Sequence, residues 1–283
     1  MDHTILFNLA QTDVSQPLLP EILLPVLQQP PFVSLPGSFN TRDLGLLPGS
    51  PIRPGLAYRS GGFLTPDLPA EAAAAIVWKL GIKRIFDLRS VKEHERQPDP
   101  AIAGAEVVWT RPGEEDPLVN LEEFVEGEGE KGYANMYLDV LRVYAGAIKA
   151  VLEYVRDRDG SEESEAFMFH CAAGRDRTGI VAGLLLTLAG ASPETVELDF
   201  LLSRIGTEPA REQLMAFAMQ GSGARSVDAP GFHNLCNLKL SCWQAFVKAV
   251  EQEHGGFEGY VKGTLGFSDG DLAKIRRNLV LEN

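Results

Sequence analysis

Residues 169–179 read Phe-His-Cys-Ala-Ala-Gly-Arg-Asp-Arg-Thr-Gly, and this stretch decides how the rest of the chain is interpreted. It follows a short apolar run, residues 166–169, that is typical of a buried central strand, and the apolar residues after it predict a helix from Thr178 onward. A loop between a strand and a helix directs successive backbone N–H groups and the positive end of the helix dipole at one point. The sequence therefore predicts an anion site in this loop.

The side chains of the loop suit a phosphoryl group. Cys171 opens the loop, where a positive field favours the nucleophilic thiolate over the thiol. Arg177 offers a planar fork of donors that matches two phosphate oxygens. The small residues between them allow the backbone to close around a ligand: Ala172, Ala173 and Gly174. We expect these five residues to hold a phosphate and to bring a cysteine to it.

This motif carries a family resemblance. Residues 170–179 resemble the His-Cys-x5-Arg-Thr/Ser-Gly loop of the cysteine-dependent protein and lipid phosphatases, and in fuller form the atypical tyrosine-phosphatase branch of bacteria and fungi. The Gly-x-Asp-Arg-Thr portion is also similar to the myotubularin lipid phosphatases. Residues 39–45, 54–61 and 87–90, the last followed by Glu93 or Glu95, resemble further elements of the branch in the expected order. The resemblance covers residues 34–281 and departs at Arg175, where the branch more often carries Lys.

The resemblance implies a metal-independent phosphatase that acts through a phosphocysteine on Cys171. Its substrates would be phosphotyrosine, phosphoserine or phosphothreonine, or phosphoinositides. The leaving oxygen needs a proton, and the chain has no Trp-Pro-Asp sequence to supply it. Asp176 is the first candidate for this general acid, and Asp87, also a candidate substrate ligand, is the second. The alternatives are a loop-bracing carboxylate for Asp176 and a partner of a buried arginine for Asp87.

Other residues near the loop are candidates for binding or for structural roles. Thr178 is either the N-cap of the following helix or, as the resemblance implies, a hydroxyl that steadies the sulfur. Arg175 either reaches a second anionic group of the substrate or folds back onto an acid of the protein. His170 is expected to be a structural neighbour and not a base. Three more arginines are expected to brace loops around the pocket, with Arg59 also a candidate substrate ligand: Arg42, Arg59 and Arg89.

Composition narrows the class of protein. The chain has 283 residues, 45% of them hydrophobic, and a net charge of -13, which disfavours nucleic acid and anionic membranes as partners. Three cysteines make no disulfide framework, and no Cys/His cluster predicts a metal or other cofactor. The first fifteen residues contain no Lys or Arg, so we expect no signal peptide, and the longest apolar run, 180–188, is too short to cross a bilayer. We expect a cytoplasmic protein without integral membrane association, whose partner is a phosphorylated protein, lipid or small molecule.

The pattern of elements predicts an α/β fold, with a central mixed sheet flanked by helices and a helical C-terminal cap. Strands are expected at 82–88, 107–109 and 166–169, with short strands within 38–60, and helices at 65–80, 133–157, 178–189, 193–205, 207–219, 240–253, 256–264 and 269–279. Residues 1–283 should form one phosphatase domain, with an N-terminal extension, 1–33, packed on it and a candidate lid at 205–235, hinged near Gly221. Residues 114–130 contain eight acidic residues and no basic one, which favours a solvated loop over a cation site.

Three other functions remain compatible with the sequence. One is a catalytically silent phosphate-binding module, and another is a phosphatase that acts on a small phosphorylated metabolite in a biosynthetic pathway. The third is a thiol enzyme of another chemistry, such as sulfur transfer or arsenate reduction. Turnover of a generic aryl phosphate would distinguish the first of these from a phosphatase.

Overall fold

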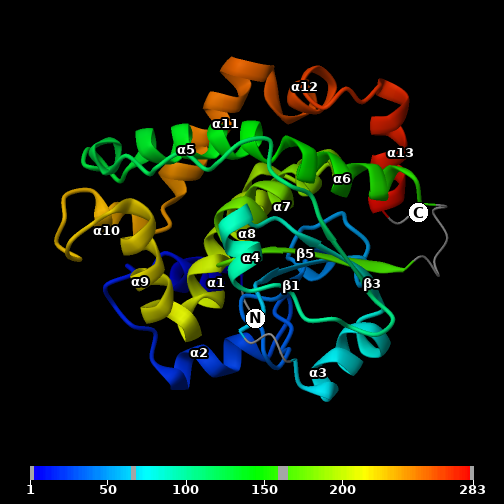
Figure 1. The fold of residues 1–283 in the computed structure, drawn as a ribbon, viewed down its shortest axis with the longest axis horizontal. Coiled ribbons are helices and arrows are strands. Elements are labelled where there is room, and N and C mark those ends of the chain that lie inside the picture. The colour runs from blue at the N-terminus through cyan, green and yellow to red at the C-terminus, as the bar shows by residue number, and fades with distance from the viewer. Residues whose placement is uncertain (1–2, 65–67, 159–164, 281–283) are drawn as a thin grey trace.

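A five-stranded sheet lies at the centre of the computed structural model, which describes residues 3–64, 68–158 and 165–280 (Figure 1). The strand order is β1-β2-β5-β3-β4. The strands are β1 (Arg42–Asp43), β2 (Ala57–Gly61), β3 (Ile82–Asp87), β4 (Glu106–Trp109) and β5 (Ala166–Cys171). β1 pairs antiparallel to β2 and the other pairs are parallel. The predicted mixed sheet is therefore confirmed, with the strand that precedes the loop in its middle.

The two faces of the sheet are covered unequally. Along β5 the side chains alternate, so that Phe167 and Phe169 enter the larger core while Ala166 and Met168 enter the smaller one. Because both faces are buried, β5 is apolar throughout, as expected of a central parallel strand. Its carboxyl end brings Cys171 to the edge of the sheet, where parallel α/β folds bind their ligands.

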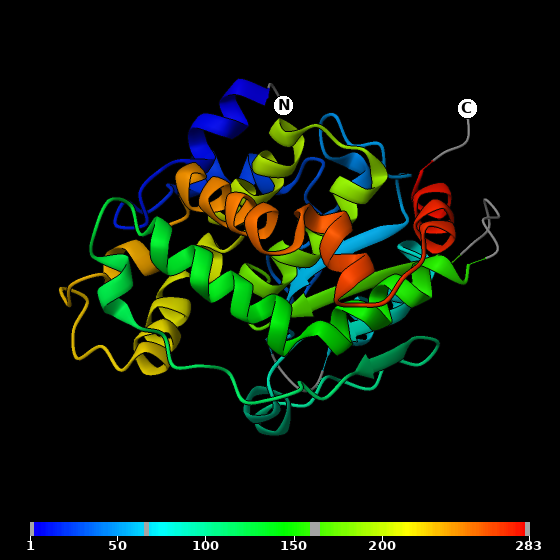
Figure 2. The same ribbon diagram turned by 90° about the horizontal axis from the view of Figure 1, so that it is seen from above.

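Helices fill both faces and the C-terminal half of the chain. Those before the loop are α1 (His3–Ala10), α2 (Pro20–Leu27), α3 (Ala70–Ala74), α4 (Val91–Arg96), α5 (Glu130–Val143) and α6 (Ala145–Arg156). Those after it are α7 (Asp176–Ala189), α8 (Pro193–Gly206), α9 (Arg211–Ser222), α10 (Phe232–Cys236), α11 (Leu240–His254), α12 (Gly256–Gly263) and α13 (Asp269–Leu279). Figure 2 shows α5 and α6 running end to end with α11 alongside α5. The predicted helical C-terminal region is present.

Short turns of other helix types complete the secondary structure: η1 (Leu44–Leu46), η3 (Leu121–Phe124), η4 (Glu208–Ala210) and a π-helical turn, η2 (Ala75–Lys79), that continues α3. α3 and η2 pack on the smaller face of the sheet through Ala72, Ile76 and Val77. The proposed helix start at Thr65-Pro66 lies outside the described residues. The C-terminal end of this helical stretch is at Leu80, just before Gly81, as predicted.

One long helix over 133–157 was expected, and this prediction is wrong. The structure has two helices, α5 and α6, which meet at Tyr144, where φ is -100° and ψ is 16°. Apolar periodicity continues across the break, so the pattern alone gave no sign of it. The break turns the Tyr144 hydroxyl toward the phosphate loop, where it accepts a hydrogen bond from Arg177.

The N-terminal residues pack on the rest of the chain. Leu6, Ala10 and Val14 are buried in the main core, and α1 contacts α8. Leu23 and Val26 of α2 are buried in the same core. Among the described helices, none combines the length and the apolar content that a membrane crossing requires.

Candidate active site

The phosphate loop, residues 171–177, is wedged tightly against the end of β2. Gly174 has a φ of +62°, and a Cβ built on it would lie 2.5 Å from the carbonyl carbon of Ser60 and closer still to Ser60 O and to the amide nitrogen of Gly61. Contacts this short to backbone atoms cannot relax. Glycine is therefore required at position 174 both by backbone conformation and by space.

Three carbonyl oxygens of the loop accept hydrogen bonds from neighbouring parts of the protein. The Gly62 amide donates to Ala172 O at 3.1 Å, and Asn40 Nδ2 donates to Ala173 O at 3.3 Å and to Gly174 O at 2.9 Å. In a trans peptide the N–H points away from the C=O. The amides that follow these three carbonyls therefore face the opposite side, and in the described part of the chain they donate to no acceptor: Ala173, Gly174 and Arg175. This arrangement forms an anion cradle.

Two buried arginines and one aspartate support the cradle. Arg59 Nη2 donates to Gly174 O at 2.7 Å, and Nη1 pairs with Asp199 Oδ2. Arg42 Nε pairs with the other oxygen of Asp199 at 3.2 Å, and both arginines also donate to Ser203 Oγ. Arg59 is completely buried, so its role is to brace the loop, and the sequence-based placement of Arg59 as a substrate ligand is corrected. The sequence analysis missed Asp199, although an acid among the apolar residues of α8 was a visible sign.

Cys171 is the last residue of β5 and only 2% of its surface is exposed. The preceding residue, His170, is fully buried, and its Nε2 lies 2.9 Å from Asp99 Oδ2. Burial alone would lower the pKa of His170, but the Asp99 carboxylate outweighs it and raises that pKa above its ordinary value. The Asp99 carboxylate thus favours the protonated imidazole, whose positive charge would lie next to Cys171. The sequence gave no reason to select Asp99.

Asp87 belongs to a buried ion-pair network and not to the cavity. Its carboxylate accepts from Arg89 Nε at 2.8 Å and Nη2 at 2.9 Å, and it lies 2.8 Å from His94 Nδ1. Burial would raise the pKa of Asp87, but the charges of His170 and Arg89 lower it to about 2. Asp87 is thus the partner of a buried arginine, and its placement as a substrate ligand is corrected.

Three side chains of this network lie close enough together to hold a metal ion, and they are the group of this kind among the described residues: Asp87, Asp99 and His170. The guanidinium of Arg89 already donates to both carboxylates, to Asp87 Oδ2 at 2.9 Å and to Asp99 Oδ1 at 2.6 Å. Because a cation is part of the cluster, a metal ion would be repelled from it.

Arg177 is oriented by a carboxylate on α4. Its Nη1 and Nη2 donate to Glu93 at 2.6 and 2.8 Å, and Nη1 also donates to Tyr144 Oη at 3.0 Å. Burial would raise the pKa of Glu93, but Arg177 lowers it to about 2. Glu93 itself is fixed as the third residue of α4 by a capping box with Ser90. Of the two glutamates considered from the sequence, Glu93 reaches the loop, and Glu95 is exposed.

Asp176 lies at the cavity wall with two donors around it. Tyr137 Oη donates to Oδ1 at 2.7 Å, and Arg175 Nε lies 3.1 and 3.2 Å from the two carboxylate oxygens. Its side chain keeps 29% exposure and lines the cavity that also contains Cys171. Asp176 therefore faces the cavity that contains Cys171, whereas Asp87 does not line it.

Arg175 is fully engaged by the protein. Its Nη1 donates to Cys236 O at 3.1 Å and its Nη2 to Leu235 O at 3.0 Å, in addition to the contact with Asp176. These carbonyl groups lie at the C-terminal end of α10, where a guanidinium is a suitable donor, and Leu235 O also accepts from Tyr133 Oη at 2.8 Å. Arg175 lines the cavity, but the expectation that its side chain is free to reach a second anionic group is corrected.

Thr178 is buried inside the first turn of α7. The N-cap of α7 is Arg175, so the N-cap interpretation of Thr178 is wrong. Its hydroxyl is fully buried and has no hydrogen-bond partner in the described ranges of the chain. The contact with sulfur that the resemblance implies stays a prediction.

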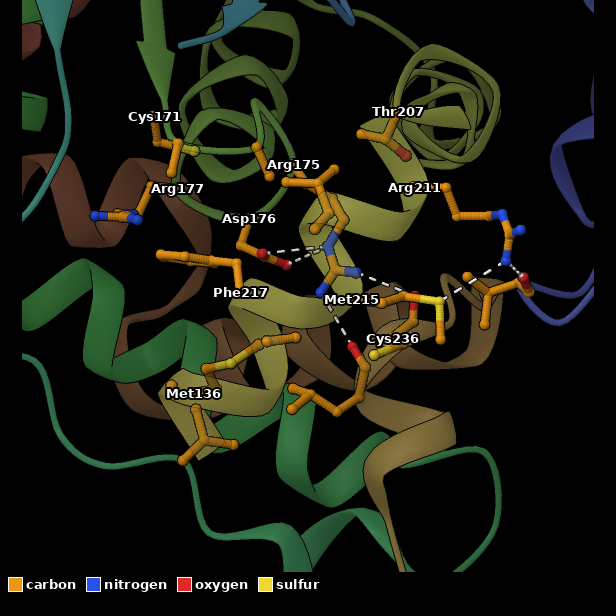
Figure 3. Close-up of a pocket in the computed structure, with 18 residues that line it drawn as sticks. Met136, Cys171, Arg175, Asp176, Arg177, Thr207, Arg211, Met215, Phe217 and Cys236 are labelled. Atoms are coloured by element: carbon orange, nitrogen blue, oxygen red, sulfur yellow. Dashed lines mark hydrogen bonds and ion pairs between the residues drawn. The ribbon is translucent and has the colours of Figure 1, made fainter. Parts of the chain in front are cut away.

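A cavity of about 170 Å³ lies between the phosphate loop and α9 (Figure 3). Cys171, Asp176 and Arg177 line one side, and Phe217 and Met215 of α9 line the other. A second cavity of about 570 Å³ adjoins it and shares Asp176, Arg177 and Phe217. A phosphorylated side chain therefore has room to extend from the loop under α9.

Comparison with known proteins agrees with this geometry. A tyrosine-protein phosphatase of Nostoc commune is 27% identical over 214 residues, covering 75% of this chain and 70% of its own length. A putative tyrosine-protein phosphatase of Cupriavidus necator is 27% identical, covering 84% of each chain, and the triple specificity protein phosphatase PtpB of Mycobacterium tuberculosis is 23% identical, covering 86% of this chain and 96% of its own. The sequence model of the tyrosine phosphatase family matches residues 33–281. With its cysteine, amide cradle and oriented arginine, the chain belongs to the tyrosine phosphatase family.

Proposed function

We propose that the protein hydrolyses phosphomonoesters through a phosphocysteine on Cys171, with phosphotyrosine as its principal substrate. The observation that supports this most is the cradle of three free amides beside Cys171, completed by the Arg177–Glu93 pair in the described part of the chain. The Cys171 thiolate attacks phosphorus, and the bond from phosphorus to the leaving oxygen breaks. The cradle and Arg177 hold the equatorial oxygens, where negative charge resides during transfer. Water then attacks the phosphocysteine, which releases phosphate and regenerates the thiolate.

Asp176 is the proposed general acid. It shares the cavity with Cys171, and Tyr137 and Arg175 fix its carboxyl group in place. In the first step Asp176 gives its proton to the leaving oxygen, and in the second step the same group takes a proton from the attacking water. The exposed fraction of its side chain allows it to regain a proton from solvent between cycles.

The shape and charge of the cavity favour a phosphorylated aromatic side chain. Beyond Arg211 at its start, the wall on α9 is apolar, formed by Leu214, Met215 and Phe217, which suits the ring of a phosphotyrosine. Phosphoserine and phosphothreonine are smaller and would reach Cys171 with fewer contacts. A phosphoinositide with several phosphates would need further cations, but Arg175 is already bound to α10 and Asp176, and Arg211 at the cavity wall pairs with Glu208. We therefore place phosphoinositides second, although the name of the mycobacterial relative includes triple specificity.

Residues 205–235 are proposed to act as a lid. The segment contains α9, which covers the cavity although none of its residues is buried in the described structure. α9 ends at Gly223, whose φ of +67° permits a sharp change of direction beside the expected hinge at Gly221.

The decisive experiment replaces the nucleophile. Cys171→Ser is expected to abolish turnover of a phosphotyrosine peptide, while tungstate still binds because the amide cradle is intact. A chelator is expected to leave the wild-type rate unchanged, since no metal enters the proposed steps. Full activity in Cys171→Ser would refute the covalent route, and turnover restricted to a small phosphorylated metabolite would favour that alternative substrate class.

A further inference from the structure

The loop between α1 and α2 connects both ends of the lid segment. We call residues 12–18 the strap. The strap lies outside residues 33–281, which the family model matches. It contacts residues that precede α9 and residues that follow α10, which lie more than twenty positions apart in sequence.

At the start of the lid segment the strap is held by two charged side chains. Arg204 Nε donates to Thr12 O at 2.9 Å and its Nη2 donates to Gln16 O at 2.7 Å. The Leu18 amide donates to Glu208 Oε1 at 3.0 Å. Arg204 pairs with Glu208, and their side chains are only 3% and 7% exposed. These buried polar groups have their partners in the strap, so removing the strap would leave them unsatisfied.

At the far end of the lid segment the strap binds a second set of residues. The Val14 amide donates to Asn237 Oδ1 at 3.1 Å, and Asn237 Nδ2 donates to Asp13 Oδ2 at 2.7 Å. His233 Nε2 lies 3.0 Å from the same carboxylate oxygen. Asp13 and Val14 thus fix the residues directly after α10, while Val14 O accepts from Arg211 at the start of α9.

Val14 borders the cavity itself. It is 6% exposed and lines the same cavity as Cys171, together with Arg211 and Cys236. No residue of α9 is fully buried in the described structure, although Met215, Ala218 and Met219 pack against the main core. The strap contacts the N-terminal end of α9 directly through Arg211, and through His233 it contacts α10, which packs against α9.

We propose that the strap is a specificity element: it positions α9 over the cavity, and Val14 limits the size of the group that carries the phosphate. This inference rests on the proposed function for the kind of substrate, an aryl phosphate. The positioning residues are Asp13 and Val14, and neither takes part in the chemical steps.

The first test varies the size of the side chain at position 14. Val14→Ala and Val14→Leu both keep the backbone contacts, and they change the cavity in opposite directions. The dissociation constants of phenylphosphonate and 2-naphthylphosphonate are measured by calorimetry, beside turnover of phenyl phosphate and 2-naphthyl phosphate. Val14→Ala is expected to favour the naphthyl ligand by about threefold or more, and Val14→Leu to disfavour it by a similar factor, because one methylene in a filled pocket has at least this effect.

The control is Leu23→Ala, which removes a buried side chain of the same N-terminal region that lines none of the described cavities. It should lower stability without changing the naphthyl-to-phenyl ratio. A ratio that stays constant in both Val14 variants, or that moves in the same direction in both, would overturn the proposal. If the wild type binds the two phosphonates but hydrolyses neither phosphate ester, the proposed function is refuted. The ratio of the two dissociation constants still tests the role of the strap in that case.

The second test concerns the position of α9. Asp13→Ala removes the acceptor for Asn237 and His233, whereas Asp13→Asn keeps one acceptor oxygen. Backbone hydrogen exchange within 211–222 and 232–236 is expected to be at least about fivefold faster in Asp13→Ala than in the wild type, with partial rescue in Asp13→Asn and no change in α7. The KM of a phosphotyrosine peptide should rise while kcat changes little. Unchanged exchange in α9 and α10 would show that the strap does not hold them.

Discussion

Asp176 shows how one side chain can be both fixed and available for chemistry. Its carboxylate lies between the Tyr137 hydroxyl and the Arg175 guanidinium, yet part of it remains open to the cavity. Tyr137 is fully buried, and burial together with the charge of Asp176 raises the pKa of its hydroxyl well above the ordinary value. The phenol therefore stays a donor at any working pH and keeps the carboxyl group aimed in one direction.

Asp176→Asn is expected to lower kcat about 10²–10⁴-fold on phenyl phosphate. The loss should be much smaller on p-nitrophenyl phosphate, because a good leaving group needs little protonation. Steady-state rates on the two substrates provide the comparison. Tyr137→Phe is the matched control: it removes one contact to Asp176 but not the proton, so the dependence on the leaving group should stay as in the wild type. Equal losses on both substrates in Asp176→Asn would show that the carboxylate only braces the loop.

At the level of elements, the proposed phosphate site is the connection from β5 to α7. The loop cannot move independently because its carbonyls are bound by residues from the region around Asn40 and from β2, and α8 supplies the Asp199 that holds Arg59. The cradle is formed before any ligand arrives, so binding does not require the amides to be rearranged.

Gly174→Ala tests this rigidity. The substitution forces a Cβ into the backbone of β2 at a positive φ, and we expect it to destabilise the fold by about 3 kcal/mol and to abolish tungstate binding. Gly190→Ala is the control, since Gly190 also has a positive φ, but a Cβ there would meet no described atom within 4 Å. It should cost about 1 kcal/mol, without loss of tungstate binding. Urea unfolding and calorimetry measure the two effects.

The local features of these elements could be predicted from the sequence, and the tertiary contacts could not. The order of strand, loop and helix around Cys171 follows from apolar pattern and turn residues, which are local properties. Asp99, Asp199 and Tyr144 are brought to the site by folding, from positions with no shared motif. Arg175 was assigned to a ligand because its charge was visible and its distant carbonyl partners were not.

On the scale of the whole molecule, some of the carboxylates that give the chain its negative charge stabilise the fold when they are ionised. Glu93 and Asp87 both have a pKa of about 2, because the attraction of nearby cations exceeds the effect of burial. Their ordinary pKa values are 4.5 and 3.8. A carboxyl group whose pKa is lower in the folded state stabilises the fold fully above its ordinary pKa. That contribution is lost as the pH falls toward 2.

The contribution of these two carboxylates to the free energy of unfolding is therefore expected to be nearly constant above about pH 5 and to be lost between about pH 4.5 and 2. Urea unfolding at a series of pH values measures this slope. Glu93→Gln should be less stable at about pH 7, since Arg177 loses its partner, but its stability should fall less steeply below about pH 4.5, because one titrating group has been removed. A slope identical to that of the wild type would show that Glu93 does not titrate in this range.

The cavity under α9 contains two of the three cysteines, Cys171 and Cys236. Burial raises the pKa of the Cys236 thiol, so at neutral pH this sulfur is protonated and a weak nucleophile. With Cys171 as the proposed nucleophile, an electrophilic ligand that fills the cavity has a protonated thiol as its second cysteine neighbour. We therefore expect mild electrophiles to leave Cys236 unlabelled, whereas strong alkylating agents would label the cavity without identifying the nucleophile.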